Sequence, residues 1–203
     1  TTEIYTLSLH DALPICEATP LQISDRLDIA IDEAGRVEDL VRGLLDYARE
    51  PNPSRAPVAV VAVIRDGVAA VEAAMGPYPG IEIDCPEALV AELDRDQVTR
   101  VVGNLVQNAR EAAGPEGRVR LTARESGQDL VLMAEDSGPG VPESILDRVF
   151  DPFVTGKVRG TGLGLAIVNR IVEAHGGEVG ADRSPVLGGA RFALRVPLRD
   201  PAR

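Results

Sequence analysis

An apolar residue recurs at every third or fourth position between residues 20 and 50, and this pattern constrains the fold most strongly. The positions are Leu27, Ala30, Ala34, Val37, Val41, Leu44 and Ala48. This heptad spacing predicts a long helix with one apolar seam, which packs in a coiled coil or a helical bundle. A helix that lies on its own globular domain is the alternative. Because the heptad is unbroken, we expect a bundle partner.

A proline-rich break at residues 51–57 predicts a linker after this helix. Residues 58–203 then read as one domain in which strands and helices are mixed. We expect helices ending near 74, at 94–113 and at 163–174, and strands at 80–84, 89–93, 117–124, 129–135, 178–181 and 190–197. The first two strands are expected to form a hairpin. Antiparallel strands among helices favour an α+β layered fold over a doubly wound parallel sheet.

The composition excludes several classes of protein. A net charge of −11 makes nucleic acid an unfavourable partner, because its phosphates would be repelled. No apolar run reaches the roughly 18–20 residues that a membrane span needs. We therefore expect no membrane contact from these residues. Cys16 and Cys85 are widely separated and fit no metal-binding spacing, so we expect a reducing, cytoplasmic setting. Aromatic residues make up only 3%, so the core must consist of Val, Leu, Ile and Ala.

Two polar motifs carry candidate chemistry. Asn104 and Asn108 share one helix face, and an amide oxygen suits a Mg²⁺ ion that already carries phosphates and waters. Asn on a helix is more often a solvated or capping residue. Asp136 ends an apolar strand and is followed by Gly138 and Gly140. A carboxylate there can accept a hydrogen bond from an exocyclic amine, although DSGPG is also an ordinary turn.

Two further motifs lie in the glycine-rich stretch that follows. Phe150 and Phe153 are two of only three phenylalanines, and both fall in a polar loop. Aromatic side chains there are costly unless they anchor a segment on the core. Lys157 can reach a phosphate or lie in solvent. The run 160–165 opens a helix, and its backbone N–H groups are suited to cradle phosphates.

Taken together, NLVQNA, DSGPG, FDPFVTGK and GTGLGL resemble, in this order and spacing, the asparagine, phenylalanine and two glycine boxes of sensor histidine kinases. The resemblance covers residues 57–198 and extends over 19–50, which is similar to the second helix of the dimerisation and phosphotransfer hairpin. It implies a Bergerat-type ATP-binding fold. That fold is a two-layer α/β sandwich with a mixed sheet, helices on one face and a flexible lid over the nucleotide.

The resemblance also implies roles for individual residues. Asn108 would ligate Mg²⁺ beside Asn104, and Asp136 would read the adenine amine. Phe150 and Phe153 would anchor the lid, while Lys157 and Arg110 would contact phosphates. The remaining residues expected at the ATP site are Gly138, Gly140, Gly160, Thr161, Gly162, Leu163, Gly164 and Leu165.

One position separates a kinase from a hydrolase. Relatives of this fold that hydrolyse ATP carry a glutamate general base where this chain has Asn104, and an amide cannot act as a base at neutral pH. We therefore expect transfer of the γ-phosphoryl group to a histidine, for relay to the receiver domain of a response regulator. The resemblance further implies a homodimer through the hairpin.

The stretch TTEIYTLSLHDALPI, residues 1–15, does not match the rest of the chain. A nucleotide string that resembles a widely used sequencing adapter translates into all of it, so we interpret it as an assembly artefact. The likeness of the segment around His10 to a phosphorylation box is then coincidental, and we expect the native sequence to begin near Cys16. We expect a fragment that binds Mg-ATP but lacks its acceptor histidine, from a protein that an upstream segment can anchor to a membrane. His175 is expected to have a packing or capping role.

Two other interpretations stay open. The first is a regulator that uses this ATP fold to sequester a partner, as anti-sigma proteins do. Those proteins carry glutamate at the position of Asn104 and do not need the heptad helix, and both features favour the kinase. The second is an inert fragment whose exposed seam leads to self-association.

Overall fold

The computed structural model describes residues 20–157 and 160–199. The chain divides into two compact units, Thr1–Arg42 and Gly43–Arg203. The adapter-like residues 1–15 with His10, and Cys16, lie outside the described residues. Among the helices of the described ranges, none combines the length and the apolar character that a bilayer span requires.

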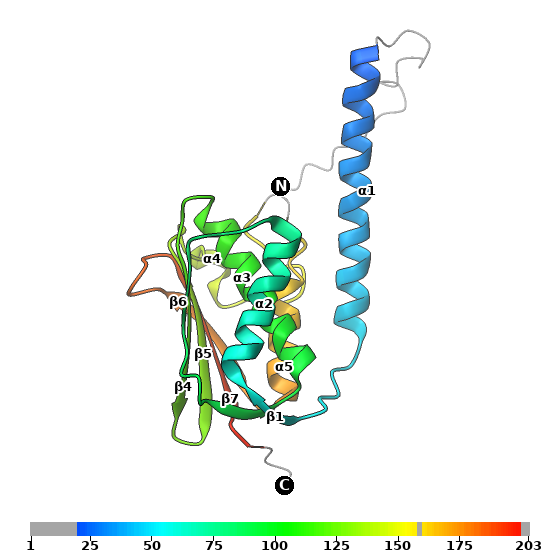
Figure 1. The fold of residues 1–203 in the computed structure, drawn as a ribbon. Coiled ribbons are helices and arrows are strands. Elements are labelled where there is room, and N and C mark those ends of the chain that lie inside the picture. The colour runs from blue at the N-terminus through cyan, green and yellow to red at the C-terminus, as the bar shows by residue number, and fades with distance from the viewer. Residues whose placement is uncertain (1–19, 158–159, 200–203) are drawn as a thin grey trace. The chain divides into compact units, whose positions relative to one another are not determined.

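The predicted long helix is confirmed as α1, Pro20–Ala48 (Figure 1). Its apolar seam is exposed in the single chain, with exposed fractions of 56% at Leu27, 58% at Val37 and 51% at Val41. Exposed apolar side chains at this spacing are what a second helix would cover. The bundle partner itself stays a prediction.

A two-stranded sheet corrects two expectations. β1, Ala56–Ala59, begins inside the predicted linker, and it pairs antiparallel with β3, Val90–Leu93. β3 was expected to form a hairpin with residues 80–84, and that expectation is wrong. The Leu89 carbonyl accepts a hydrogen bond from the N–H of Val60 at 3.0 Å, which holds the chain beside β1 before β3 begins.

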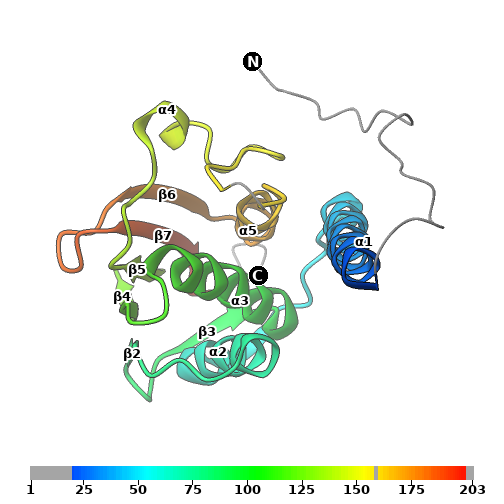
Figure 2. The ribbon, with the colours of Figure 1, turned by 90° about the horizontal axis from the view of Figure 1, so that it is seen from above.

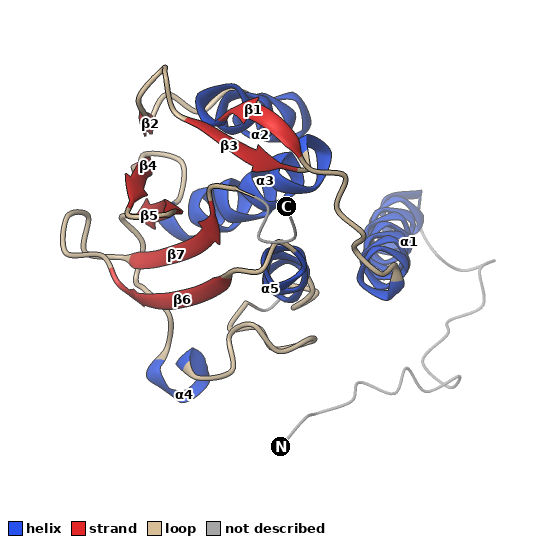
Figure 3. Cartoon of the chain, turned by 90° about the horizontal axis from the view of Figure 1, so that it is seen from below, coloured by secondary structure: helices blue, strands red, loops and turns tan. Residues whose placement is uncertain are grey.

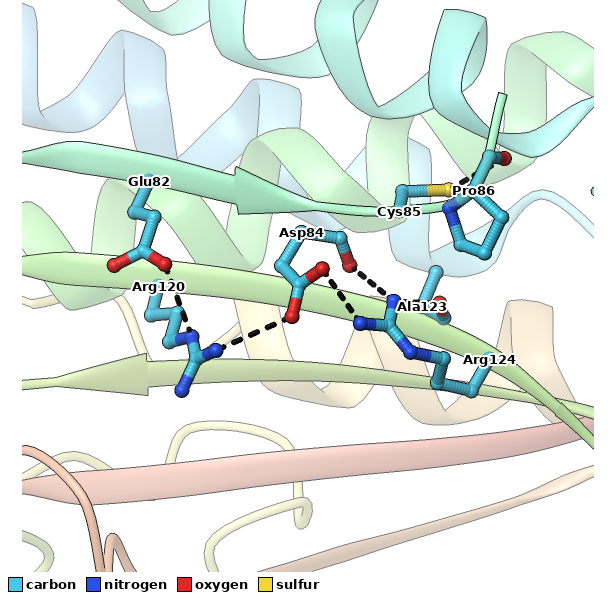
Figure 4. Close-up of polar contacts among 7 residues, drawn as sticks. All are labelled: Glu82, Asp84, Cys85, Pro86, Arg120, Ala123 and Arg124. Carbon is cyan, nitrogen blue, oxygen red and sulfur yellow. Dashed lines mark hydrogen bonds and ion pairs between the residues drawn. The ribbon is translucent and has the colours of Figure 1, made fainter.

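β2, Ile81–Asp84, instead pairs in parallel with β4, Val119–Ser126. Side-chain ion pairs join the two strands (Figure 4). Arg124 donates to Asp84 at 2.5 Å, and Arg120 lies 3.2 Å from Asp84 and 3.5 Å from Glu82. Because of these arginines the pKa of Asp84 is lowered, and the hydrogen bond from Arg124 is the largest cause.

The main sheet has five strands in the order β2-β4-β5-β7-β6, with only the β2–β4 pair parallel. β5 is Asp129–Asp136, β6 is Glu178–Arg183 and β7 is Ala190–Pro197. Figure 2 shows α2, α3 and α5 on one face of this sheet, and Figure 3 shows the β1–β3 pair apart from the five strands. The expected mixed sheet with helices on one face is therefore confirmed.

The helices of this layer are α2, Val60–Met75, α3, Arg95–Ala113, and α5, Gly164–Ala174, and a short α4, Glu143–Leu146, precedes α5. Alternate residues of β5 and β7 are buried beneath them, including Leu130, Leu132, Phe192 and Leu194. As expected, the core consists mainly of Val, Leu, Ile and Ala.

Buried His175 joins the ends of two helices. Its Nδ1–H donates to the carbonyl of Ile171 at 2.7 Å, and its Nε2 accepts the N–H of Asp94, the N-cap of α3, at 3.1 Å. An imidazole that donates at one nitrogen and accepts at the other is neutral. Burial lowers the pKa of His175, which keeps it neutral. The expected packing role agrees with this geometry.

We predict that His175→Gln makes the free energy of unfolding less dependent on pH below neutral pH. A histidine with a lowered pKa in the folded state contributes its full stability above its unfolded pKa of about 6.5, and that stability is lost as the pH falls below this value. The free energy of unfolding of the variant should be about 1–3 kcal/mol lower near neutral pH, because the Ile171 carbonyl and the Asp94 N–H lose the imidazole as their hydrogen-bond partner. Urea denaturation between about pH 7 and pH 5 measures both effects, and parallel curves for wild type and variant would contradict the prediction.

Candidate functional site

Asp136 lies at the end of β5 with its side chain buried. Its Oδ1 accepts the N–H of Gly138 at 2.8 Å and the N–H of Ala190 at 3.1 Å. Among the residues that the structure describes, Oδ2 has no hydrogen-bond partner. Burial raises the pKa of Asp136, while the two backbone N–H groups and Lys157 oppose this shift. Two hydrogen bonds to Oδ1 thus fix the carboxylate, and Oδ2 is available to a ligand.

Two glycines allow backbone to approach this carboxylate. A Cβ at Gly138 would lie 2.6 Å from the carbonyl oxygen of Ala112, and one at Gly189 would collide with Oδ1 of Asp136. Any side chain at either position would displace backbone or the carboxylate. Gly140 was also predicted in this turn and has a φ of +87°.

The asparagine motif and the second glycine motif meet in space. Asn104 and Asn108 are half-buried on α3, and α5 begins beside them. A Cβ at Gly164 would lie 3.4 Å from Oδ1 of Asn104 and 3.7 Å from Nδ2 of Asn108. The amide face of α3 therefore adjoins the N-terminus of α5, where unpaired backbone N–H groups favour anions.

Lys157 connects the loop to this face of α3. Its Nζ donates to Oδ1 of Asn108 at 3.0 Å and to Oε2 of Glu111 at 2.5 Å. Glu111 lies three residues after Asn108, so both side chains share one face of the helix. The amide oxygen of Asn108 is therefore already directed at a cation.

The loop that contains Phe150 and Phe153 is held by one side-chain contact and one backbone contact. Phe150 packs edge-on against Phe192, with ring centroids 6.2 Å apart, and its predicted anchoring role agrees with this contact. Phe153 is 61% exposed, and the expected role of its side chain as a lid anchor stays a prediction. Its backbone makes the contact, because its N–H donates to the carbonyl of Gly162 at 2.9 Å.

This backbone contact explains Gly162, whose φ is +68°. A Cβ there would lie 2.5 Å from the carbonyl carbon of Phe153. Gly160 lies against Thr155, whose Oγ1 would be 2.5 Å from an added Cβ. The described residues of the two loop motifs thus contact each other at Phe153–Gly162 and at Thr155–Gly160.

The other predicted residues of these motifs divide between loop and core. Oγ1 of Thr161 accepts the N–H of Leu163 at 3.4 Å. The side chain of Leu163 is buried, and that of Leu165 packs against the core. Only the backbone of Leu163 is left for contact with a ligand, whereas Leu165 is partly exposed.

Arg110 is not part of this constellation, and its expected phosphate contact stays a prediction. Its Nη1 donates to the carbonyl of Gly76 at 2.9 Å, and its guanidinium lies 4.7 Å from the ring centroid of Tyr78. The carbonyl groups at the end of α2 and an aromatic face satisfy this cation. The arginine follows Asn108 by two residues, and this spacing directs it to another face of the helix.

A metal ion could bind at this site only together with a ligand that supplies further coordinating oxygens. Within the described ranges no group of three or more His, Cys, Asp or Glu side chains is placed to hold a metal. The amide oxygen of Asn108 accepts from the ammonium of Lys157, and this arrangement fits a hard cation that obtains its other ligands from phosphates and water.

Three residues of the site were not expected from the sequence. Glu111 was signalled only by its position one turn after Asn108, and Gly189 only by the pair Gly188–Gly189. Ala190 acts through its N–H, which is independent of its side chain. No local sequence pattern identifies it.

The chain is similar in sequence to two relatives and in structure to one solved protein. The chain is 33% identical over 183 residues to the nitrogen regulation protein NtrY of Azorhizobium caulinodans, covering 86% of this chain and 23% of NtrY. It is 32% identical over 185 residues to the sensory histidine kinase/phosphatase NtrB of Rhodobacter capsulatus, covering 84% of this chain and 52% of NtrB. It therefore spans about half or less of the length of these relatives.

The structure of histidine kinase ThkA in complex with the response regulator protein TrrA is similar, with a TM-score of 0.73 and 27% identity, covering 92% of this chain and 54% of ThkA. Residues 93–200 match the family model described as histidine kinase-, DNA gyrase B- and HSP90-like ATPase. That range contains α3, the Asp136 turn and the N-terminus of α5. The chain therefore belongs to the histidine kinase-, DNA gyrase B- and HSP90-like ATPase family.

Proposed function

We propose that this chain is the ATP-binding and phosphoryl-donating core of a sensor histidine kinase. It would transfer the γ-phosphoryl group of ATP to a histidine nitrogen, for relay to an aspartate of a response regulator. The packing of Gly164 against Asn104 and Asn108 carries the proposal, since it joins an anion-binding helix end to neutral amide ligands.

The adenine base binds at Asp136 in this proposal. Oδ1 is saturated by two backbone N–H groups, and Oδ2 accepts the exocyclic amine of the base. A carboxylate that is held before the ligand arrives loses little conformational freedom on binding. Gly138 allows backbone to approach the carboxylate closely, and Gly140 adopts the positive φ of the adjoining turn.

The phosphates bind at the N-terminus of α5. Backbone N–H groups of residues 160–164 and the positive end of the helix dipole stabilise their charge. Lys157 now pairs with Glu111, and several phosphate charges attract its ammonium more strongly than one carboxylate does. Asn108, with Asn104 beside it, would hold Mg²⁺. When bound, that ion neutralises charge on the transferring phosphoryl group.

Transfer rather than hydrolysis follows from the residues around Asn108. Asn104 offers no base for an attacking water. Glu111 is a carboxylate on the same helix, but it follows Asn108 by three residues and does not occupy the position of Asn104, where hydrolysing relatives of this fold carry their base. A positioned phosphoryl donor without a water-activating base favours an external nucleophile.

The acceptor in this proposal is not His175. Both of its ring nitrogens are engaged and its side chain is buried. The complex of ThkA with TrrA supports a response regulator as the partner that receives the phosphoryl group. The exposed seam of α1 supports a homodimer through a helical hairpin.

We predict that Asp136→Asn weakens ATP binding by about 10- to 100-fold, because a charge-assisted hydrogen bond is lost. Asp129→Asn, at the opposite end of β5 and paired with Arg195, is the matched control and should bind ATP as wild type does. Calorimetric titration with Mg-ATP measures both variants. Equal affinity of wild type and Asp136→Asn would remove the base-recognition assignment.

We predict that Asn108→Ala removes most of the Mg²⁺ dependence of nucleotide binding. The variant lacks the amide oxygen that now accepts from a cation. Gln107→Ala, which changes an exposed neighbour on the same helix, should keep the dependence. ATP affinity is measured across a series of Mg²⁺ concentrations, and an unchanged series in Asn108→Ala would exclude Asn108 as a ligand.

A further inference from the structure

The connection between β6 and β7 ends directly against Asp136. The N–H of Gly189 donates to the backbone carbonyl of Asp136 at 3.0 Å, and the N–H of Ala190 donates to its Oδ1 at 3.1 Å. The position of this connection therefore sets one of the two hydrogen bonds that fix the carboxylate.

Ser184 closes this connection through its backbone. Its N–H donates to the carbonyl of Gly189 at 2.8 Å, and its carbonyl accepts the N–H of Gly188 at 3.1 Å. The side chain adds two further bonds, since Oγ accepts the N–H of Leu187 at 2.9 Å and that of Val186 at 3.2 Å. One serine thus organises residues 184–189, which we call the 184–189 turn.

The hydroxyl of Ser184 also reaches β5. It donates to Oε1 of Glu135 at 2.8 Å, and the exposed fractions of the two residues are only 3% and 4%. Glu135 directly precedes Asp136, and it is paired in register with Arg191 on β7. A buried carboxylate is costly unless it is hydrogen-bonded. This buried bond therefore ties the 184–189 turn to the strand that carries Asp136.

We propose that Ser184 is a positioning residue for recognition of the nucleotide base. Its hydroxyl fixes the 184–189 turn and so holds the Ala190 N–H on Oδ1 of Asp136. Oδ2 is thereby aimed at the exocyclic amine of the purine. This inference rests on the proposed function. Ser184 acts only through Asp136, so it affects nucleotides that carry the amine and not those that lack it.

The test compares ATP with inosine triphosphate, which has a carbonyl in place of the amine. We expect Ser184→Ala to weaken ATP binding roughly five- to tenfold, as the loss of one buried hydrogen bond implies, and to change inosine triphosphate binding less than twofold. Ser184→Thr keeps the hydroxyl and should retain the wild-type preference for ATP. Affinities are measured by calorimetric titration of the full chain in the presence of Mg²⁺.

Two additional variants separate positioning from a general loss of structure. Asp182→Asn breaks the ion pair with Arg191 across β6 and β7 without touching the 184–189 turn, and it should keep the preference for ATP. Ser184→Cys keeps the shape of the side chain but forms weaker hydrogen bonds, so an intermediate preference is expected even if Ser184→Ala does not fold.

The outcomes are distinct. Equal weakening of both nucleotides in Ser184→Ala or Ser184→Cys, or an unchanged preference in both, would overturn the role of Ser184. A wild-type chain that does not distinguish ATP from inosine triphosphate would instead overturn the base recognition of the proposed function. A preference that falls from wild type through Ser184→Cys to Ser184→Ala supports the inference.

Discussion

Oδ1 of Asp136 accepts hydrogen bonds from two backbone segments, the turn at Gly138 and the first residue of β7, and the site depends on this interaction. It joins the end of β5 to β7 and leaves Oδ2 for a ligand. The glycines at 138 and 189 are required because a Cβ at either would occupy space held by backbone or by the carboxylate. A carboxylate fixed in this way is prepared for its ligand before binding, which reduces the entropic cost of recognition.

The phosphate side of the site follows from a second constraint, the close approach of α5 to α3. Gly164 brings the helix N-terminus beside Asn104 and Asn108, and Lys157 supplies a cation on the same face. Anion-binding backbone, amide oxygens and an ammonium are thus combined, and among the described residues no group of three or more His, Cys, Asp or Glu side chains is placed to hold a metal. Such a set suits a ligand that brings its own negative charge and its own metal ligands.

Much of this was predictable from the sequence, because the signals are local. Apolar periodicity indicated α1, residues typical of helix ends indicated α3 and α5, and the glycine and asparagine motifs indicated the residues that meet in the site. What the sequence did not indicate are partners that are distant in the chain. β3 pairs with β1 and not with β2, and Arg110 donates to a carbonyl at the end of α2. No sequence pattern identified Ser184, since its role depends on the burial of Glu135 on another strand.

The central claim is that this site donates a phosphoryl group to a histidine and does not hydrolyse ATP. The most direct measurement follows the γ-phosphate of radiolabelled ATP in the presence of the full chain, Mg²⁺ and a separate hairpin that carries a histidine acceptor. We predict acid-labile, base-stable label on the hairpin with little free phosphate, because Asn104 cannot activate water. Rapid release of free phosphate without labelled histidine would contradict it.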